Sequence, residues 1–274
     1  MGARRRVRGV GHAILVHPLL NRILLLIYVV AGILLAIALA RLWGFIGDRL
    51  WILLQAPLVI GLGNTVVFSV SVIVIGTLIG FFFGWARVSG HPIVAWPVAV
   101  YIDLIRGIPA LVLIIFANFW LPFFLGSRDP NAGLTFSVIA LGMHTGAYQA
   151  EIFRAGFQSI PRGQVEAAAA VGLSHWQSMR FVILPQTFRV SLPALGNEFA
   201  TVIKDTSLLS AIGAAELSFW GRNSAQSAFG HLDWVFAIWI VIALVYFLIT
   251  YIITHVVGAI EESVRVPGLG SVSV

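Results

Sequence analysis

Long apolar runs alternate with short polar segments along this chain. A helix that crosses a bilayer needs about 20 mainly apolar residues, because the hydrocarbon core is roughly 30 Å thick and a helix rises 1.5 Å per residue. The pattern therefore predicts an all-α, polytopic membrane protein with about six transmembrane helices. The six predicted spans are residues 23–45, 62–85, 96–120, 134–152, 190–212 and 233–257.

The composition agrees with this pattern. Hydrophobic residues make up 59% of the 274 positions and charged residues only 10%, whereas soluble domains average about 45–50% and about 25%. A single soluble core could not bury so much apolar surface, which excludes a soluble enzyme. The chain has no cysteine, so a disulfide-rich secreted domain is also excluded.

The net charge of +6 reflects membrane orientation rather than nucleic-acid binding, because single arginines stand between apolar runs instead of forming a basic stripe. Arginines cluster before the first span, at 4–8 and at Arg22, which predicts a cytoplasmic N-terminus. Six crossings then place residues 152–189 and the C-terminal tail in the cytoplasm as well. A cleaved signal peptide is the less favoured interpretation of the N-terminus, because its apolar run is too long.

The predicted cytoplasmic segment 152–189 is rich in helix formers. Residues 164–171 favour a helix because alanine loses little side-chain entropy there, and Gly172 suits a left-handed C-cap. Ser174 can cap a second helix at 175–183, which Pro185 is expected to end. The sequence thus predicts a short helix–turn–helix at the membrane face.

This segment carries a long spaced signature: Glu-Ala-Ala, three residues, Gly, nine residues, and then Ile-x-Leu-Pro. The matching positions are Glu166, Ala167, Ala168, Gly172, Leu184 and Pro185, and Val182 replaces the isoleucine. With this pattern the chain resembles the permeases of ABC importers over roughly residues 60–265. Further motifs are similar to the polar amino-acid uptake branch of that family; they lie at 63–65, 106–109, 147–151, 163–164 and 204–208.

The resemblance implies a division of the chain. Residues 1–59 are expected to hold a basic cytoplasmic N-terminus, an added transmembrane helix and an outer loop, since family members commonly have five spans. Residues 60–265 form the permease domain, which includes the coupling segment 152–189, and residues 266–274 form a tail. One further departure is Ile108, which stands where threonine is usual.

The resemblance also implies partners. The six signature residues form a coupling helix that docks on a separate ATPase subunit. A second permease copy, identical or similar, completes the path in a bacterial inner membrane. An extracytoplasmic binding protein delivers a small polar amino acid to the outer loops near 126–133 and 214–231. Membrane lipid surrounds the chain.

The chain itself is not expected to be an enzyme. A phosphate-binding loop requires G-x-x-x-x-G-K-[ST], and the only lysine, Lys204, follows Ile203. The chain is therefore predicted to bind no cofactor, and its partner ATPase uses the ATP and Mg. No metal site is expected, because His144 has no second histidine or cysteine at ligand spacing.

Polar residues inside apolar spans need a reason, because a charge near the bilayer centre is costly. The candidates for a substrate path are Arg106, His144, Tyr148, Glu151, Asn197, Thr201, Lys204 and Asp205. Structural alternatives stay open: Lys204 can pair with Asp205, and Arg106 with Asp103 one turn earlier. His144 is more commonly a packing residue than a ligand.

Two rival functions use the same residues. In an ion-coupled secondary transporter, Lys204, Asp205 or Glu151 would take up protons and the coupling signature would be coincidence. In a membrane scaffold, the chain would bind an ATPase without moving solute. An importer for opines or another small amino-acid-like solute is a third possibility, since the residues do not select one substrate.

Overall fold

The computed structural model describes residues 51–228 and 230–264, and these residues contain helices and connecting turns but no strand. The fold is therefore the all-α, polytopic type that the apolar pattern predicts. The expected added helix at 23–45, the N-terminal arginines and the tail at 266–274 lie outside the described residues.

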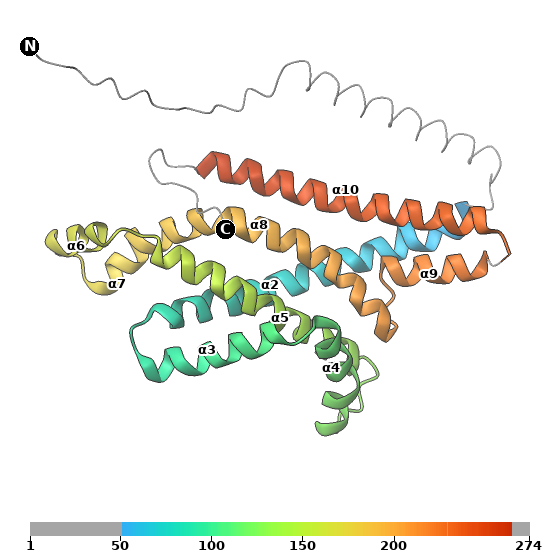
Figure 1. The fold of residues 1–274 in the computed structure, drawn as a ribbon, viewed down its shortest axis with the longest axis horizontal. Helices are drawn as coiled ribbons and strands as arrows, with labels where there is room; N and C mark the ends of the chain where they lie inside the picture. The colour runs from blue at the N-terminus through green and yellow to red at the C-terminus, as the bar shows by residue number, and fades with distance from the viewer. Residues whose placement is uncertain (1–50, 229, 265–274) are drawn as a thin grey trace, which may run out of the picture. The chain divides into compact units, whose positions relative to one another are not determined.

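The described helices follow one another with short connections (Figure 1). In chain order they are η1 (Pro57–Gly61), α2 (Leu62–Val88), α3 (Pro92–Gly107), α4 (Ala110–Phe124), α5 (Ala132–Gln158), α6 (Arg162–Ala170), α7 (His175–Ser178), η2 (Met179–Ile183), α8 (Leu184–Asp205), η3 (Thr206–Ile212), α9 (Leu217–Ser227) and α10 (Leu232–Val264).

Two described helices are long and apolar enough to cross a membrane by length and composition. They are the continuous helix Trp51–Val88, which includes η1 and α2, and α10. Helices α5 and α8 have 27 and 22 residues, lengths that also reach across a hydrocarbon core, but they carry more polar residues. The polar side chains of α5 and α8 are thus the ones that need a function.

The predicted span at 96–120 consists of two helices with a break between them. The chain bends by 100° between α3 and α4, because Ile108 leaves the helix with φ −100° and ψ 131°. A residue before proline disfavours the helical region, and Pro109 follows. The bend leaves two helices of 16 and 15 residues, a broken pair of the kind that membrane proteins tolerate where protein or water surrounds the break.

Helices α2 and α5 pack closely because both present glycine to the other. A Cβ atom on Gly80 would lie 2.6 Å from the Cβ of Gln149, and one on Gly146 would lie 2.9 Å from the Cβ of Ile79. Gly76 and Gly142 lie in similar contacts. Small residues let membrane helices approach until their backbones are in van der Waals contact, so this pair forms the tightly packed centre of the described fold.

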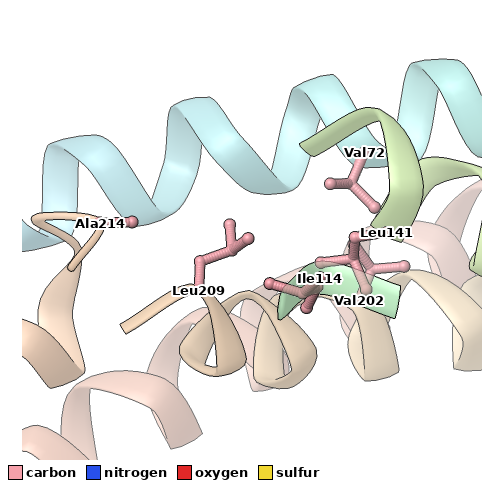
Figure 2. Packing of buried hydrophobic residues seen from close by; sticks show 6 residues of the cluster. All are labelled: Val72, Ile114, Leu141, Val202, Leu209 and Ala214. Carbon is pink, nitrogen blue, oxygen red and sulfur yellow. The ribbon is translucent and has the colours of Figure 1, made fainter. Parts of the chain in front are cut away.

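A buried apolar cluster packs α4, α8 and η3 against this pair (Figure 2). It draws one side chain from each of α2, α4, α5, α8, η3 and the turn after η3. Its members are Val72, Ile114, Leu141, Val202, Leu209 and Ala214. The cluster holds α4 against α5 beyond the 100° bend, so the break is a fixed feature of the packing.

Helix α8 lies between α5 and α10. On one side, Gly156 of α5 faces Ser191, and on the other Gly196 of α8 contacts Val257 of α10. Figure 1 shows α6 and α7 at one end of the helices and α9 at the other. The signature segment and the outer connections are therefore separated by the length of the bundle.

Candidate functional site

The signature segment contains the turn that the sequence predicts. Gly172 has φ +82°, its N–H donates to the Ala169 carbonyl at 3.0 Å, and the Leu173 N–H donates to the Ala168 carbonyl at 3.1 Å. These two bonds form a Schellman motif, which closes a helix with a left-handed glycine. No atom lies within 4 Å of a Cβ built at Gly172, so backbone conformation alone requires glycine there.

A capping box starts the next helix, as Ser174 predicts. The Gln177 N–H donates to the Ser174 hydroxyl at 3.3 Å, and the Ser174 N–H donates to the Gln177 side chain at 2.8 Å. The C-cap of α6 at Gly172 and the N-cap of α7 at Ser174 are two residues apart. Local hydrogen bonds therefore set the direction of the chain from α6 to α7.

The expectation that Pro185 ends this second helix is wrong. The chain passes through the π-helical turn η2, in which the Leu184 N–H donates to the Met179 carbonyl, and continues into α8 with Pro185 in its first turn. Proline is tolerated in a first turn, and a π turn relieves the contact of its ring with the preceding carbonyl. The coupling segment is thus joined directly to α8.

Side-chain contacts strengthen this junction. The Gln186 amide donates to Gln164 of α6 at 2.5 Å and to the Val182 carbonyl at 2.9 Å. Of the signature residues, Glu166, Ala167 and Pro185 are exposed and Ala168 is buried. Large apolar side chains are exposed beside them, among them Val171 (77%) and Trp176 (58%). An apolar exposed surface of this kind is typical of a binding site for a partner.

Three of the predicted path residues meet at the bend between α3 and α4. The Arg106 guanidinium lies 5.0 Å from the centre of the Tyr148 ring, a cation–π distance. The His144 ring lies 5.2 Å from the same ring, and the Tyr148 hydroxyl donates to the Arg106 carbonyl at 3.4 Å. Within the described part of the chain, Arg106 forms no ion pair with Asp103, so that alternative is not observed.

Glu151 has a different environment from the other path candidates. Its carboxylate pairs with Arg154 at 2.6 Å and lies 3.8 Å from Arg87 at the end of α2. Arg154 also donates to Gln158 at 3.0 Å. Because two arginines compensate its charge, Glu151 joins α2 to α5 rather than facing an open path.

The α8 candidates follow one stripe of that helix. Asn197 and Lys204 are exposed, Thr201 and Asp205 are half-buried, and the Thr201 hydroxyl donates to the Asn197 carbonyl at 3.1 Å. Among the described residues, Lys204 and Asp205 form no ion pair with each other. The stripe therefore carries a cation and a carboxylate that form no direct salt bridge within the described part of the chain.

Glu198 links α8 to α5, and it is absent from the predicted path set. It accepts a hydrogen bond from Thr145 at 2.9 Å, and Thr145 is the neighbour of His144 on α5. The signal is present in the sequence, because Glu198, Thr201 and Asp205 share one side of a helix. This bond joins α5 to α8 beside the position of His144.

A second missed carboxylate is fully buried. Glu216 accepts from the Tyr246 hydroxyl at 2.6 Å and from the backbone N–H groups of Ser218 and Phe219 at 2.9 and 2.7 Å. It caps the first turn of α9 with its side chain, where serine, threonine, aspartate and asparagine are the usual caps.

No group of three or more possible metal ligands occurs among the described residues.

Polar stripes, a broken helix and close glycine packing define this chain as a polytopic permease-type membrane protein. It belongs to the family of binding-protein-dependent transport system inner membrane components, whose profile matches residues 73–266. The sequence resemblance to ABC importer permeases is thereby confirmed.

Two curated relatives show the extent of the similarity. The L-cystine transport system permease protein TcyB of Bacillus subtilis is 34% identical over 220 residues, which cover 80% of this chain and 90% of that protein. The glutamine transport system permease protein GlnP of Escherichia coli is 37% identical over 213 residues, covering 77% and 94%.

Solved structures show the same fold. An amino acid ABC transporter crystallised with histidines matches with a TM-score of 0.66 and 32% identity, over 76% of this chain and 94% of the other. The inward-facing MetNI methionine ABC transporter matches with a TM-score of 0.65 and 19% identity, over 80% and 99%, a likeness of fold alone.

Proposed function

We propose that this chain is the membrane-spanning permease subunit of an ATP-driven importer for polar amino acids. The observation that carries the proposal is the signature turn, where Gly172 closes α6 and the following helix runs unbroken into α8. The named relatives transport cystine and glutamine, which supports an amino acid as the solute.

The signature segment of each permease is the docking site for one ATPase subunit. A pair of permeases therefore binds two ATPase subunits. Glu166 and Ala167 are exposed for contact, whereas Ala168 packs inward. The exposed carboxylate can accept a charge-assisted hydrogen bond, and Val171 and Trp176 add apolar surface. The ATPase uses ATP and Mg, and this chain catalyses no reaction.

The link from the docking site to the path is mechanical. Gln186 ties α6 to the start of α8, and η2 connects α7 to α8 without a break. A displacement of α6 and α7 by the ATPase is therefore transmitted along α8, the helix that carries Asn197, Thr201, Lys204 and Asp205.

The path lies along the polar residues of α5 and α8. Arg106, Tyr148 and His144 form its part at the bend, and the Thr145–Glu198 bond continues it to the α8 stripe. A water-lined route satisfies such polar groups within a membrane, and broken helices expose backbone groups to it. A second permease, identical or similar, completes the route.

An extracytoplasmic binding protein delivers the solute at the end of the bundle that carries α9. The outer connections at 126–133 and 214–231 are predicted docking loops. A cavity of about 380 Å³ joins the first loop to the start of the second through Asp129, Pro130 and Gly213. In this orientation, the two termini face the cytoplasm of a bacterium and the chain crosses its inner membrane several times.

The test is purification of the chain from its native host in mild detergent, followed by identification and quantification of every co-purifying protein. We expect an ATPase with the wild-type chain, its loss when 166–172 is disrupted, and amino-acid uptake into vesicles only when ATP is present. Uptake that continues without ATP would show an ion-coupled transporter. An ATPase that binds without uptake would show a scaffold.

A further inference from the structure

Two side chains tie the start of α2 to the connection between η3 and α9. The Asn64 amide donates to the Ala215 carbonyl at 2.7 Å, and the Leu217 N–H donates to the Thr65 hydroxyl at 3.0 Å. One turn earlier, a Cβ atom on Gly61 would lie 2.9 Å from the Leu217 Cα. Asn64 and Thr65 belong to the Gly-Asn-Thr motif of the sequence, so this motif joins two segments that are 151 and 152 residues apart.

Glu216 ties the same connection to α10. Its buried carboxylate accepts from the Tyr246 hydroxyl of α10 at 2.6 Å and from the N–H groups of Ser218 and Phe219 at 2.9 and 2.7 Å. The Tyr246 hydroxyl also lies 3.1 Å from the Ser218 hydroxyl. Because loss of any of these bonds would leave a buried polar group unsatisfied, the contact with α10 is costly to break.

Further bonds hold η3 and α9 together as one unit. The Arg222 guanidinium of α9 donates to the Ser210 carbonyl of η3 at 2.8 Å. The Ser224 hydroxyl of α9 donates at 2.5 Å to the carbonyl of Leu53, which lies in the helix that continues into α2. Residues 206–227, the outer hairpin, are therefore bonded internally and to the helices on both sides.

The half of α8 next to the coupling segment is held less firmly. Its Thr187 and Ser191 hydroxyls are buried but have no hydrogen-bond partner among the described residues. Both residues lie beside Gly156 of α5. Buried hydroxyls without partners cost free energy, so this contact with α5 should separate more readily than the bonds that hold the outer hairpin.

The firmly held and the weakly held regions meet where α8 ends at Asp205 and η3 begins at Thr206. Both residues keep helical angles, with φ −70° and ψ −23° at Asp205 and φ −59° and ψ −23° at Thr206, but the helix changes from α to 3₁₀. The 3₁₀ helix has seven residues, which exceeds the usual run of about 3–4, and a 3₁₀ stretch within a longer helix commonly marks a hinge.

We propose that the outer hairpin stays fixed on α2 and α10 during transport and that α8 pivots against it at Asp205 and Thr206. The inference rests on the proposed importer function, in which the ATPase displaces the coupling segment. Ser191 lies about 21 Å along α8 from the junction, so a small rotation there separates this half of α8 from α5. Asn64 and Thr65 are positioning residues that touch no solute.

The test uses reversible cross-links, because the chain has no cysteine of its own. In the first variant, Asn64→Cys and Ala215→Cys are bridged by a short bismethanethiosulfonate. In the second, Gly156→Cys and Ser191→Cys, at positions in direct contact, are oxidised to a disulfide. Uptake of a ¹⁴C-labelled mixture of the common amino acids is measured in vesicles that contain the full transporter, its binding protein and ATP.

Each variant is compared with its own reduced form, so any effect of the substitutions themselves cancels. We expect the first bridge to leave uptake at the level of the reduced form, and the second to lower uptake to background until a reductant is added. Loss of uptake with the first bridge would mean that the outer hairpin moves against α2. Full uptake with the second would mean that α8 stays on α5. Either result would overturn the proposal.

Thr65 variants test the positioning role. Thr65→Val removes the acceptor of the Leu217 N–H and lets the outer hairpin follow α8, so we expect uptake per ATP hydrolysed to fall about 2- to 10-fold. Thr65→Ser keeps the hydroxyl and should keep the wild-type ratio. This ratio does not change when less protein is folded, so a wild-type ratio for Thr65→Val would overturn the positioning role.

The importer function is tested separately by wild-type vesicles. Uptake of the amino-acid mixture that requires ATP supports it, whatever the cross-links show. Wild-type vesicles without ATP-driven uptake would refute the importer function and the pivot that depends on it, whereas ATP-driven uptake with a blocking first bridge would refute the pivot alone.

Discussion

The interface between α2 and α5 and the exposed stripe of α8 differ in almost every physical respect. At the first, glycines bring two backbones together, and Gln149 is fully buried between them. At the second, Asn197 and Lys204 are exposed and polar residues follow one side of the helix. Both regions are helical and of similar length, so the difference lies in which side chains occupy the facing surface.

We infer that this difference separates a supporting part of the chain from the part that the proposed transport path uses. Close packing transmits strain and tolerates little change of volume, so α2 and α5 form the fixed part against which other helices can be displaced. A helix with an exposed polar side can change its neighbours without leaving buried groups unsatisfied. We infer that α8, joined to the coupling segment through η2, is the helix that responds to the ATPase.

The largest expected effect is that of Gly80→Leu in α2. A Cβ there would lie 2.6 Å from the Cβ of Gln149, so the two helices must separate, at a cost of about 3 kcal/mol. Thermal unfolding in detergent should show a much lower midpoint. Gly63→Leu is the matched control on the same helix, because no atom lies within 4 Å of its Cβ position. Equal stability of the two variants would contradict the fixed role of the interface.

Gly172→Val tests the coupling turn, which is exposed like α8 but fixed by backbone bonds. A β-branched residue at φ +82° is strained by about 1–3 kcal/mol, which shifts the turn without disturbing any packed neighbour. We expect normal membrane insertion and continued ATP hydrolysis with little uptake. Gly172→Asn should transport far better, since asparagine tolerates the left-handed region. Transport by the valine variant at the wild-type level would remove the special role of Gly172.

Substitutions of two carboxylates, Glu151 and Glu198, are expected to have effects of intermediate size. Glu151 lies between Arg154 and Arg87, so Glu151→Gln should cost about 1 kcal/mol of stability. Glu198→Gln can still accept from Thr145 and should unfold at nearly the wild-type temperature, but with reduced uptake if Glu198 lines the path. Paired unfolding and uptake measurements check both variants. A stability loss confined to Glu198→Gln would reverse the two assignments.

The sequence predicts the helices and the signature turn because their causes are local. Apolar length defines spans, and Gly172 and Ser174 supply caps through their own backbone and neighbours. The predicted helix end at Pro185 is wrong because proline is also compatible with a π turn and with the first turn of α8. The 100° bend depends on Ile108 and Pro109, whose motif indicates a break without giving its angle.

The candidate site was less predictable because it depends on contacts between distant residues. The polar stripe of α8 follows from helical periodicity, but the partners of its members do not. Tyr148 meets Arg106 only because α3 packs on α5, and Glu151 meets Arg87 only because α2 ends beside it. Glu216 gave no sequence signal, since its burial results from the packing of α9 against α10.

The smallest expected changes in the free energy of unfolding come from substituting two threonines, Thr77 and Thr201. Thr77 of α2 donates to the buried Gln149 side chain at 2.9 Å, and the amide nitrogen of Gln149 has no hydrogen-bond partner within the described residues. Thr77→Val would leave both polar atoms of this amide unsatisfied, at a cost of about 1–2 kcal/mol. Thr201 of α8 donates only within its own helix, to Asn197, so Thr201→Val should change stability by less than about 0.5 kcal/mol.

The two substitutions are chemically identical, so chemical unfolding of both variants measures the environment alone. A cost at Thr201 equal to that at Thr77 would mean that the α8 stripe is packed against protein rather than open.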